Sequence, residues 1–303
     1  MRFIDILAPL SLEDFRGLIE ERPPYKLWRS SANLGGLFGW HELNSVLRQQ
    51  RTNEIDISIL RHCQRVSLRD TTEKTSRKFK TINQLHSEKV AEVLRGGGTV
   101  RISRIDEKSN GLEPIVSDIE RILGCEASIS LYAGFGSAHH ALPVHFDRHD
   151  VLIIQLEGKK AWEVFGFGNN PYPTQPSEEI LSECPSEPTW SGELDKGEML
   201  FLPRGSWHRA SVISDIPTLQ ISIAFHYTML HELHIWLAKK LAQYPINNRH
   251  LLDWSVADDA AFESEVRKAL DEIVKHGFLD EYRKDRKLAL PKRFSISLPD
   301  LGI

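Results

Sequence analysis

Hydrophobic and polar residues alternate along four segments in the middle of the chain, a pattern that predicts half-buried β-strands. The four segments are residues 99–105, 127–133, 160–165 and 218–225. Two short apolar runs, 151–157 and 198–203, have the length of fully buried strands. Six strand candidates joined by polar turns predict a sandwich or barrel core.

Helical patterns stand on both sides of these strands. A helix begins after Ser11, whose side chain suits an N-cap, and runs to about Glu21. Further helices are predicted in HELNSVLRQQR and LHSEKVAEVLRGG, before the first strand. One helix, 115–123, interrupts the strands, and two more, 231–244 and 258–277, follow them. After residue 228 we expect helices only.

Two polar stretches have no apolar periodicity. Residues 67–80 are dense in charge, which predicts an exposed loop or flap, and residues 166–197 are rich in Gly, Pro, Ser and Asn, which predicts a long connection between strands. The chain therefore divides into an N-terminal α/β section (1–95), a β domain (96–228) and a C-terminal helical region (229–303).

Composition narrows the class of protein. The 303 residues are 41% hydrophobic and 26% charged with a net charge of −4, which is ordinary for a globular chain and gives no global attraction to nucleic acid. No apolar stretch is long enough to span a membrane, and the N-terminus is a poor signal peptide. The three cysteines form no CxxC, so a metal site must use histidine and carboxylate. We expect a cytoplasmic protein that binds neither nucleic acid nor membrane.

The segment VHFDRHDVLIIQLEGKKAWEV carries the first candidate chemistry. His145 and Asp147 stand two apart where a strand begins, so their side chains share a face and can bind adjacent corners of one metal ion. A third ligand must come from another strand. In GEMLFLPRGSWH, the pattern Gly-x5-Pro-x-Gly-x2-His predicts a strand, a tight turn and a histidine, His208, that projects into the barrel mouth.

Two histidines and one carboxylate leave three positions of an octahedral metal open, as in non-haem Fe(II) oxygenases. Such an enzyme can fill two of them with 2-oxoglutarate, whose distal carboxylate requires a buried cation. Lys160 follows on the next strand, whereas Lys159 alternates to the other face. Because buried lysines are rare unless paired, Lys160 indicates a bound anion.

These residues resemble a known family. HFDRHDVLIIQLEGKKAWEV and GEMLFLPRGSWH are similar to the signatures of the ribosomal oxygenases, which are JmjC-type cupin hydroxylases. The resemblance extends through LRGGGTVRISRI and SLYAGFGSAHHALPVHFD and covers about residues 20–226. One departure is Val212, which stands where many cupins have asparagine. The resemblance implies a mainly β fold, with a double-stranded β-helix (cupin or jelly-roll) core, N-terminal α/β elements and a C-terminal helical region.

The resemblance also implies an activity. Family members use Fe(II), 2-oxoglutarate and O2 to hydroxylate a protein side chain, so His145, Asp147 and His208 match the iron ligands and Lys160 the residue that binds the distal carboxylate. Tyr132 and Ser222 are candidates to complete the cosubstrate site. The implied substrate is a protein or peptide, such as a ribosomal protein with a target arginine or histidine. The C-terminal helices resemble a dimerising region and predict a homodimer.

Three alternatives stay open. The same iron chemistry would serve a JmjC N-methyl demethylase. The C-terminal region is short for a complete family member, which leaves a hydroxylase of a peptide natural-product precursor as a second alternative. A cupin that binds metal or ligand without turnover is the non-enzymatic alternative.

The remaining histidines and tryptophans are interpreted as structural. His149 shares the strand parity of His145 and Asp147, but a fourth ligand would crowd the open positions. His139 and His140 are expected on a loop surface, and His226, His231 and His234 are interpreted as packing or surface groups. Trp162, Trp190 and Trp207 are expected to pack in the barrel or at its rim.

Overall fold

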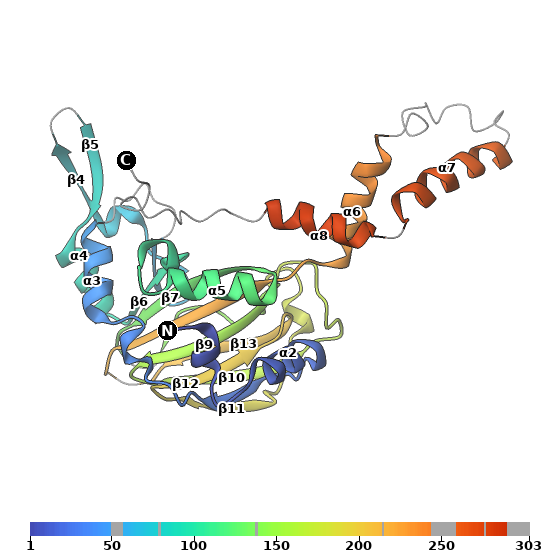
Figure 1. Cartoon of the computed structure of the whole chain (residues 1–303). Coiled ribbons are helices and arrows are strands. Elements are labelled where there is room, and N and C mark those ends of the chain that lie inside the picture. The colour runs from blue at the N-terminus through green and yellow to red at the C-terminus, as the bar shows by residue number, and fades with distance from the viewer. Residues whose placement is uncertain are drawn as a thin grey trace, which may run out of the picture. The chain divides into compact units, whose positions relative to one another are not determined.

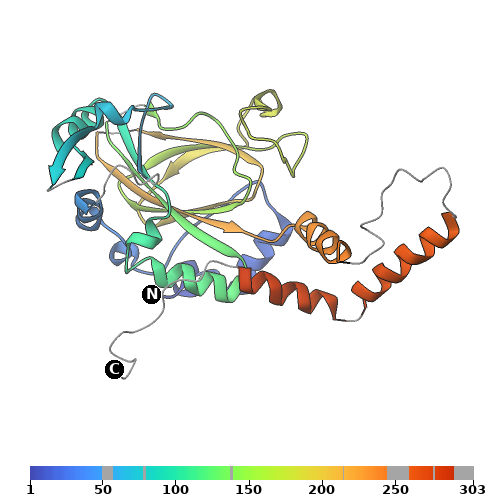
Figure 2. The same cartoon turned by 90° about the horizontal axis from the view of Figure 1, so that it is seen from above.

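The protein is represented by a computed structural model, and the structure describes residues 1–49, 57–77, 80–136, 139–213, 215–243, 259–275 and 277–289. The chain forms two compact units, Met1–His226 and Tyr227–Ile303. Figure 1 and Figure 2 show that the first unit is built around β-sheets with helices beside them and that the second is helical.

An eight-stranded antiparallel sheet forms the larger layer of the first unit, in the order β1-β12-β9-β14-β7-β6-β2-β3. Its strands are β1 (Lys26–Arg29), β2 (Ile57–Arg61), β3 (Gln64–Arg65), β6 (Gly98–Ile102), β7 (Glu126–Gly134), β9 (Asp150–Glu157), β12 (Glu198–Leu202) and β14 (Thr218–His226). The last strand, β14, lies between β7 and β9, a non-sequential order typical of jelly rolls. The N-terminal strands β1, β2 and β3 extend this sheet at its two edges.

A four-stranded sheet forms the second layer, in the order β11-β10-β13-β8. Its strands are β8 (His139–His140), β10 (Lys160–Phe167), β11 (Trp190–Leu194) and β13 (Ser206–Val212). A buried cluster joins the inner faces of the two sheets and consists of Val151, Ile153, Trp162, Val164, Leu194, Leu200 and Leu202. The two sheets therefore pack face to face, and the predicted double-stranded β-helix core with flanking helices is confirmed.

Helices cover the outer face of the larger sheet. These are α1 (Phe3–Leu7), α2 (Leu12–Glu21) and α5 (Glu113–Leu123). The rings of Phe3 and Phe15 are both buried and contact Phe225 of β14, with ring centroids 6.0 and 5.5 Å away. Residues at the start of the chain thus bury aromatic surface against the last strand of the barrel.

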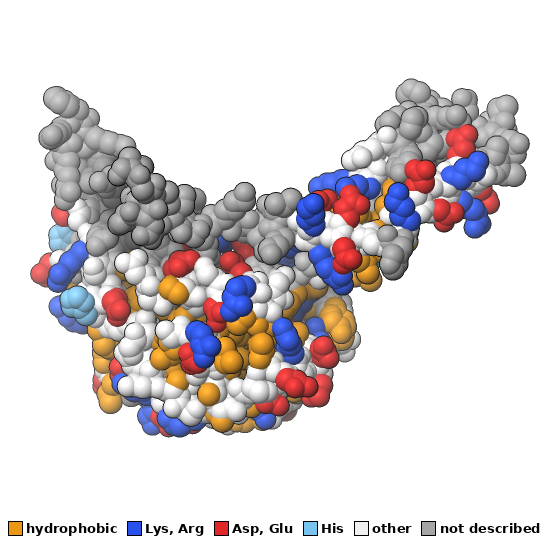
Figure 3. All heavy atoms as spheres, viewed as in Figure 1, with side chains coloured by type: hydrophobic (Ala, Val, Ile, Leu, Met, Phe, Trp, Pro, Cys, Tyr) orange, Lys and Arg blue, Asp and Glu red, His pale blue; other side chains and the backbone are white. Residues whose placement is uncertain are grey.

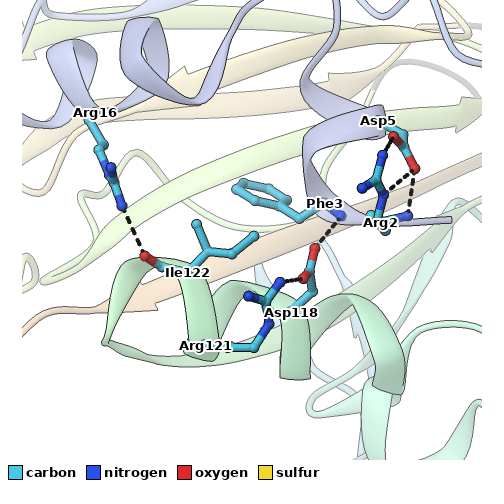
Figure 4. A network of polar contacts seen from close by, with 7 residues as sticks. All are labelled: Arg2, Phe3, Asp5, Arg16, Asp118, Arg121 and Ile122. Carbon is cyan, nitrogen blue, oxygen red and sulfur yellow. Dashed lines mark hydrogen bonds and ion pairs between the residues drawn. The ribbon is translucent and has the colours of Figure 1, made fainter.

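Polar contacts fix the same N-terminal segment to α5 (Figure 4). Asp118 accepts a hydrogen bond of 2.9 Å from the backbone N–H of Phe3, and its other oxygen pairs with Arg121. The guanidinium of Arg16 donates to the carbonyl of Ile122 at 3.0 Å. The first residues of the chain are therefore part of the barrel unit.

The predicted helices before and between the strands are confirmed as α2, α3 (Trp40–Gln49), α4 (Ser87–Arg95) and α5. The prediction of a loop over 67–80 is wrong, because β4 (Thr72–Arg77) and β5 (Lys80–Leu85) pair as an antiparallel ribbon. Their residues are mostly polar, so the alternation that marks a half-buried strand is missing from the sequence. The connection 166–197 is shorter than predicted, since β11 occupies its last part.

The second unit contains α6 (Leu230–Leu241), α7 (Asp259–Ile273) and α8 (Phe278–Ala289). Trp236 of α6 packs against Tyr282 of α8 and donates a 3.0 Å hydrogen bond to Asp285. Figure 3 shows Lys, Arg, Asp and Glu side chains interspersed over these helices. Positions 50, 51, 244, 258 and 276 of the predicted helices lie outside the described residues. No helix in the described ranges is both long and apolar enough to cross a bilayer.

Candidate metal centre and its cavity

The predicted pair His145 and Asp147 lies in the extended segment between β8 and β9. His145 forms an isolated antiparallel bridge with His208 of β13, with backbone N···O distances of 3.0 and 2.7 Å. Gly205 forms the turn before β13 at a φ of 83°, and its N–H donates to the carbonyl of Asp147 at 2.9 Å. The backbone thus brings together two segments that are far apart in the sequence.

The three predicted ligand side chains converge at this bridge. His145, Asp147 and His208 each place one ligand atom within 4.8 Å of the others. The Nδ1 atoms of His145 and His208 pair with the carbonyl oxygens of Pro143 and Ser206, at 2.8 and 2.9 Å. These contacts orient both rings and leave each Nε2 free to ligate a metal.

The charges of the cluster suit a divalent cation. Burial lowers the pKa of the His208 imidazole, so this ring is neutral at pH 7 and its nitrogen can accept a metal. Burial by itself raises the pKa of Asp147, but the nearby His208, His145 and His149 outweigh it and lower that pKa overall. Two imidazoles and one carboxylate with open positions form the facial donor set of non-haem Fe(II) sites.

A cavity of about 270 Å³ opens beside the cluster between the two sheets. The larger sheet contributes small side chains to its lining, namely Ser128, Ser130, Ser222 and Ala224, together with Val151 and Ile153. Residues with larger polar or charged side chains also line it, namely Arg101, Arg104, Tyr132, His149, Lys160, Gln220 and His226. The cavity therefore joins the candidate ligands to every other predicted site residue.

Lys160 begins β10 and points into this cavity, with 3% of its surface exposed. Burial lowers the pKa of its ammonium group to about 8, and no salt bridge to it occurs within the described residues. Lys159 lies on the opposite face, where it pairs with Glu193 at 2.7 Å. The strand alternation thus separates one buried, uncompensated lysine from one exposed, paired lysine.

Tyr132 and Ser222 lie on the neighbouring strands β7 and β14 and both line the cavity. The Nζ of Lys160 is 5.6 Å from the centre of the Tyr132 ring. Burial raises the pKa of the Tyr132 phenol, so it is neutral and can donate a hydrogen bond. The structure therefore places Tyr132 close to Lys160 and Ser222 in the lining of the cavity.

Two polar residues near Tyr132, Arg101 and Gln220, were not predicted as site residues from the sequence. The guanidinium of Arg101 lies 5.9 Å from the ring of Tyr132, its backbone partner across β6 and β7, and Gln220 pairs with Tyr132 from β14. The Nε of Arg101 and the Oε1 of Gln220 are buried without a hydrogen-bond partner. Alternation in TVRISRI and TLQISIAF places both residues on the inner face, a signal that could have identified them.

The remaining histidines differ in burial and in whether they line the cavity. His226 lies at the end of β14 and lines the cavity, with its ring centre 4.5 Å from that of His149. Burial lowers the pKa of both imidazoles. His140 is partly buried on β8 and pairs with Ser211 at 2.7 Å, instead of lying on a loop surface. His231 and His234 are exposed, as expected.

The tryptophans divide between the core and its edge. Trp162 and Trp207 are buried, with 4% and 2% of their surfaces exposed, and Trp190 is partly buried. Trp162 also lines the cavity next to His208, at 6.0 Å between ring centres.

Comparisons with known proteins agree with this geometry. A family model described as "JmjC domain" matches residues 110–233. A Dictyostelium discoideum protein named bifunctional lysine-specific demethylase and histidyl-hydroxylase NO66 is 25% identical over 225 residues, which are 72% of this chain and 41% of the relative. Ribosomal oxygenase 1 of Gallus gallus is 23% identical over 72% of this chain and 35% of the relative. The chain thus spans less than half the length of these two relatives.

Solved structures show the same fold. The Escherichia coli ribosomal oxygenase YcfD in complex with cobalt and 2-oxoglutarate superimposes with a TM-score of 0.59 at 14% identity, over 95% of this chain and 74% of that one. At this level of identity the likeness concerns the fold alone.

Proposed function

We propose that the chain is an Fe(II)- and 2-oxoglutarate-dependent dioxygenase of the ribosomal-oxygenase group that hydroxylates a side chain of a protein, as the match of residues 110–233 to a JmjC domain model supports. The observation that carries the proposal is the convergence of His145, Asp147 and His208 on one cavity that also contains the buried Lys160.

The residues of the cavity fit both Fe(II) and 2-oxoglutarate. The His-Asp-His donor set leaves metal positions open for a chelating cosubstrate and O2. Lys160 has no ion-pair partner among the described residues, and the buried Oε1 of Gln220 and Nε of Arg101 lack hydrogen-bond partners. A carboxylate would compensate the buried ammonium of Lys160 and the unpaired N–H of Arg101, whereas the Gln220 oxygen requires a donor. The Lys160–Arg101 end of the cavity therefore suits a carboxylate.

Each residue has a defined part in the reaction. His145, Asp147 and His208 would hold the iron, and Lys160 would bind the distal carboxylate of 2-oxoglutarate while Tyr132 donates a hydrogen bond nearby. When bound, iron and 2-oxoglutarate would supply the oxidation, in which 2-oxoglutarate loses its C1 carboxylate as CO2 and takes one oxygen atom of O2 to become succinate, while the other oxygen atom enters a C–H bond of the substrate. The small serines of the larger sheet would leave room beside the metal ligands for the target side chain.

The charges of the cavity favour a neutral target side chain, and we propose histidine in a ribosomal protein. Among the described lining residues, Arg101, Arg104 and Lys160 are cationic and Asp147 supplies the single carboxylate. An arginine or methylated lysine would therefore enter without a free carboxylate to pair with, at a large desolvation cost. The name of one relative, which joins lysine-specific demethylase with histidyl-hydroxylase, supports histidine over arginine but does not separate histidine from methylated lysine.

For the oligomeric state, we propose a homodimer through the C-terminal helices, with no direct contact to nucleic acid. Leu230, Ile235, Leu270, Val274 and Leu279 of that unit are exposed large apolar side chains. Light scattering of the full chain would show twice the chain mass, and a truncated chain that ends at residue 226 would be a monomer.

The deciding experiment is an incubation of the protein with Fe(II), 2-oxoglutarate and a ribosomal-protein extract, followed by mass spectrometry of the peptides. We expect a histidine that gains one oxygen atom, with one succinate formed per hydroxylation. Gain on an arginine would contradict the histidine assignment, and loss of a methyl group as formaldehyde would indicate a demethylase. If no peptide stimulates succinate formation, including short precursor peptides, the chain is a binding protein and the proposal fails.

A further inference from the structure

A second pair of histidines stands in the same cavity as the candidate metal centre. His149 follows Asp147 by two residues, and His226 is the last residue of β14. Their ring centres are 4.5 Å apart and the ring planes are inclined by 51°. Both side chains line the cavity.

This pair repeats the arrangement of the two histidines in the candidate metal centre. The rings of His145 and His208 have centres 4.5 Å apart and are inclined by 53°. The two pairs thus have the same spacing and nearly the same tilt, and each joins one histidine of the segment between β8 and β9 to one on a strand, β13 or β14. Two imidazoles at this spacing can present nitrogen atoms to one ion, since each ring centre lies only a few ångströms from a bound metal.

Neither imidazole of the second pair is engaged elsewhere. Within the described residues neither His149 nor His226 forms a side-chain hydrogen bond, whereas the Nδ1 atoms of His145 and His208 pair with carbonyl oxygens. Asp147 acts on both rings and Glu126 on His226, and these negative charges would favour a cation there, while Arg148 beside His149 and Arg104 beside His226 act against it.

We propose that His149 and His226 form a second binding site for a late first-row divalent cation, with Zn²⁺, Ni²⁺ and Cu²⁺ as the ions that imidazole prefers. Of the residues that the structure describes, only His145, Asp147 and His208 bring three ligand atoms within 4.8 Å. The second site therefore has two protein ligands, completes its shell with water and binds more weakly than the first. Its existence does not depend on the oxygenase activity.

Metal stoichiometry tests the site. Metal-free protein is dialysed against increasing Zn²⁺ and the bound metal is measured, together with the melting temperature of each variant. We expect two equivalents for the unaltered chain and one for His149→Gln and for His226→Gln. His41→Gln, which changes an exposed histidine on α3, is the matched control and should still bind two.

A further variant separates this proposal from the iron centre. His208→Gln should lose the tighter equivalent and keep the weaker one, while His226→Gln keeps the tighter. If the unaltered chain saturates at one equivalent, or if His226→Gln still binds two, the second site does not exist. If the weaker equivalent binds but the tighter one is absent from the unaltered chain and from both variants, the result contradicts the iron centre and not the second site.

Crystallography locates the ion directly. Crystals grown with excess Zn²⁺ and measured at the zinc absorption edge should show an anomalous peak between His149 and His226, and none in His226→Gln. A crystal whose His145, Asp147 and His208 hold zinc but which has no second peak would overturn the proposal.

Discussion

His145 and His208 face each other across one antiparallel bridge, in which the backbone N–H of each donates to the carbonyl of the other at 3.0 and 2.7 Å. The two proposed metal-ligating histidines are therefore held together by main chain, before any metal binds. A site with this degree of preorganisation needs little reordering on binding, which favours affinity. The third donor, Asp147, is held by Gly205 from the same turn.

Replacement of Asp147 should remove metal binding without unfolding the protein. Asp147→Ala leaves two imidazoles and no carboxylate, so the affinity for Fe(II) or Co²⁺ should fall by at least about 100-fold, more than the loss of a supporting contact costs. Metal titration and succinate formation measure the effect, and the melting temperature checks folding. Asp195→Ala, on an exposed turn, is the control. An Asp147→Ala protein that binds metal normally would contradict the assignment.

Replacement of Lys160 should affect the cosubstrate selectively. Lys160→Met removes a charged hydrogen bond to the distal carboxylate, which is worth about 1.5–3 kcal/mol and corresponds to roughly a 10- to 100-fold weaker affinity for 2-oxoglutarate. The affinity is measured by anaerobic titration of the Fe(II)-loaded protein with 2-oxoglutarate, in which the visible charge-transfer band reports binding. Lys159→Met, which loses only the exposed pair with Glu193, should bind normally. Equal effects of both variants would show that Lys160 does not bind the cosubstrate.

The lowered pKa of Lys160 predicts opposite pH dependences of binding and stability. The pKa of Lys160 is about 8 in the folded protein, against 10.5 for an ordinary lysine. As the pH rises, the folded protein without 2-oxoglutarate therefore loses this proton at a lower pH than the unfolded chain does. Affinity for 2-oxoglutarate should therefore fall as the pH rises through about 8. Between that pH and 10.5 the unfolded chain binds more protons, so Lys160 makes the free energy of unfolding rise with pH. Both trends should vanish in Lys160→Met, and a 2-oxoglutarate affinity that stays constant across a pH of about 8 would contradict the prediction.

The sequence predicted the parts of the molecule in which one face is buried. Alternation identified β7 and β14, and the parity of Lys159 and Lys160 matches the face that each occupies. The strand of His208 was less visible, because the sequence SWHRASV mixes polar and apolar residues without a clear alternation. The β4–β5 ribbon was missed because the sequences TEKTSR and KTINQL are mostly polar and do not show the apolar alternation of a half-buried strand.

Contacts between side chains that are far apart in the sequence could not be predicted from the local sequence around each residue. Nothing near His149 in the sequence indicates that its neighbour is His226, because the pairing of β14 with both β7 and β9 creates that contact. Arg101 needed the register of β6 on β7 for the same reason. Local pattern predicts which face a side chain occupies, whereas sheet order decides what it meets there.

The N-terminal aromatic residues should stabilise the barrel. Phe15 is fully buried against Phe201 and Phe225, with ring centres 5.5 Å away in both cases. Phe15→Ala leaves a large cavity and should lower the free energy of unfolding by about 3–5 kcal/mol. Chemical denaturation measures the loss, and Glu13→Ala on the exposed side of α2 should change little. A small effect of Phe15→Ala would mean that residues 1–22 are not integral to the barrel unit.

Gly205 should be required for the geometry of the metal centre. Its φ of 83° is unfavourable for other residues, and a Cβ would come within 2.9 Å of Pro173 Cδ and 3.0 Å of the Pro171 carbonyl. Gly205→Ala should therefore shift the turn that holds Asp147, lower stability by about 1–3 kcal/mol and weaken metal binding. Gly17→Ala is the matched control, because a Cβ at this half-buried position of α2 meets nothing within 4 Å and should stabilise the helix by about 0.5–1 kcal/mol. Metal titration and denaturation of both variants decide the matter, and unchanged metal affinity in Gly205→Ala would show that the turn does not position Asp147.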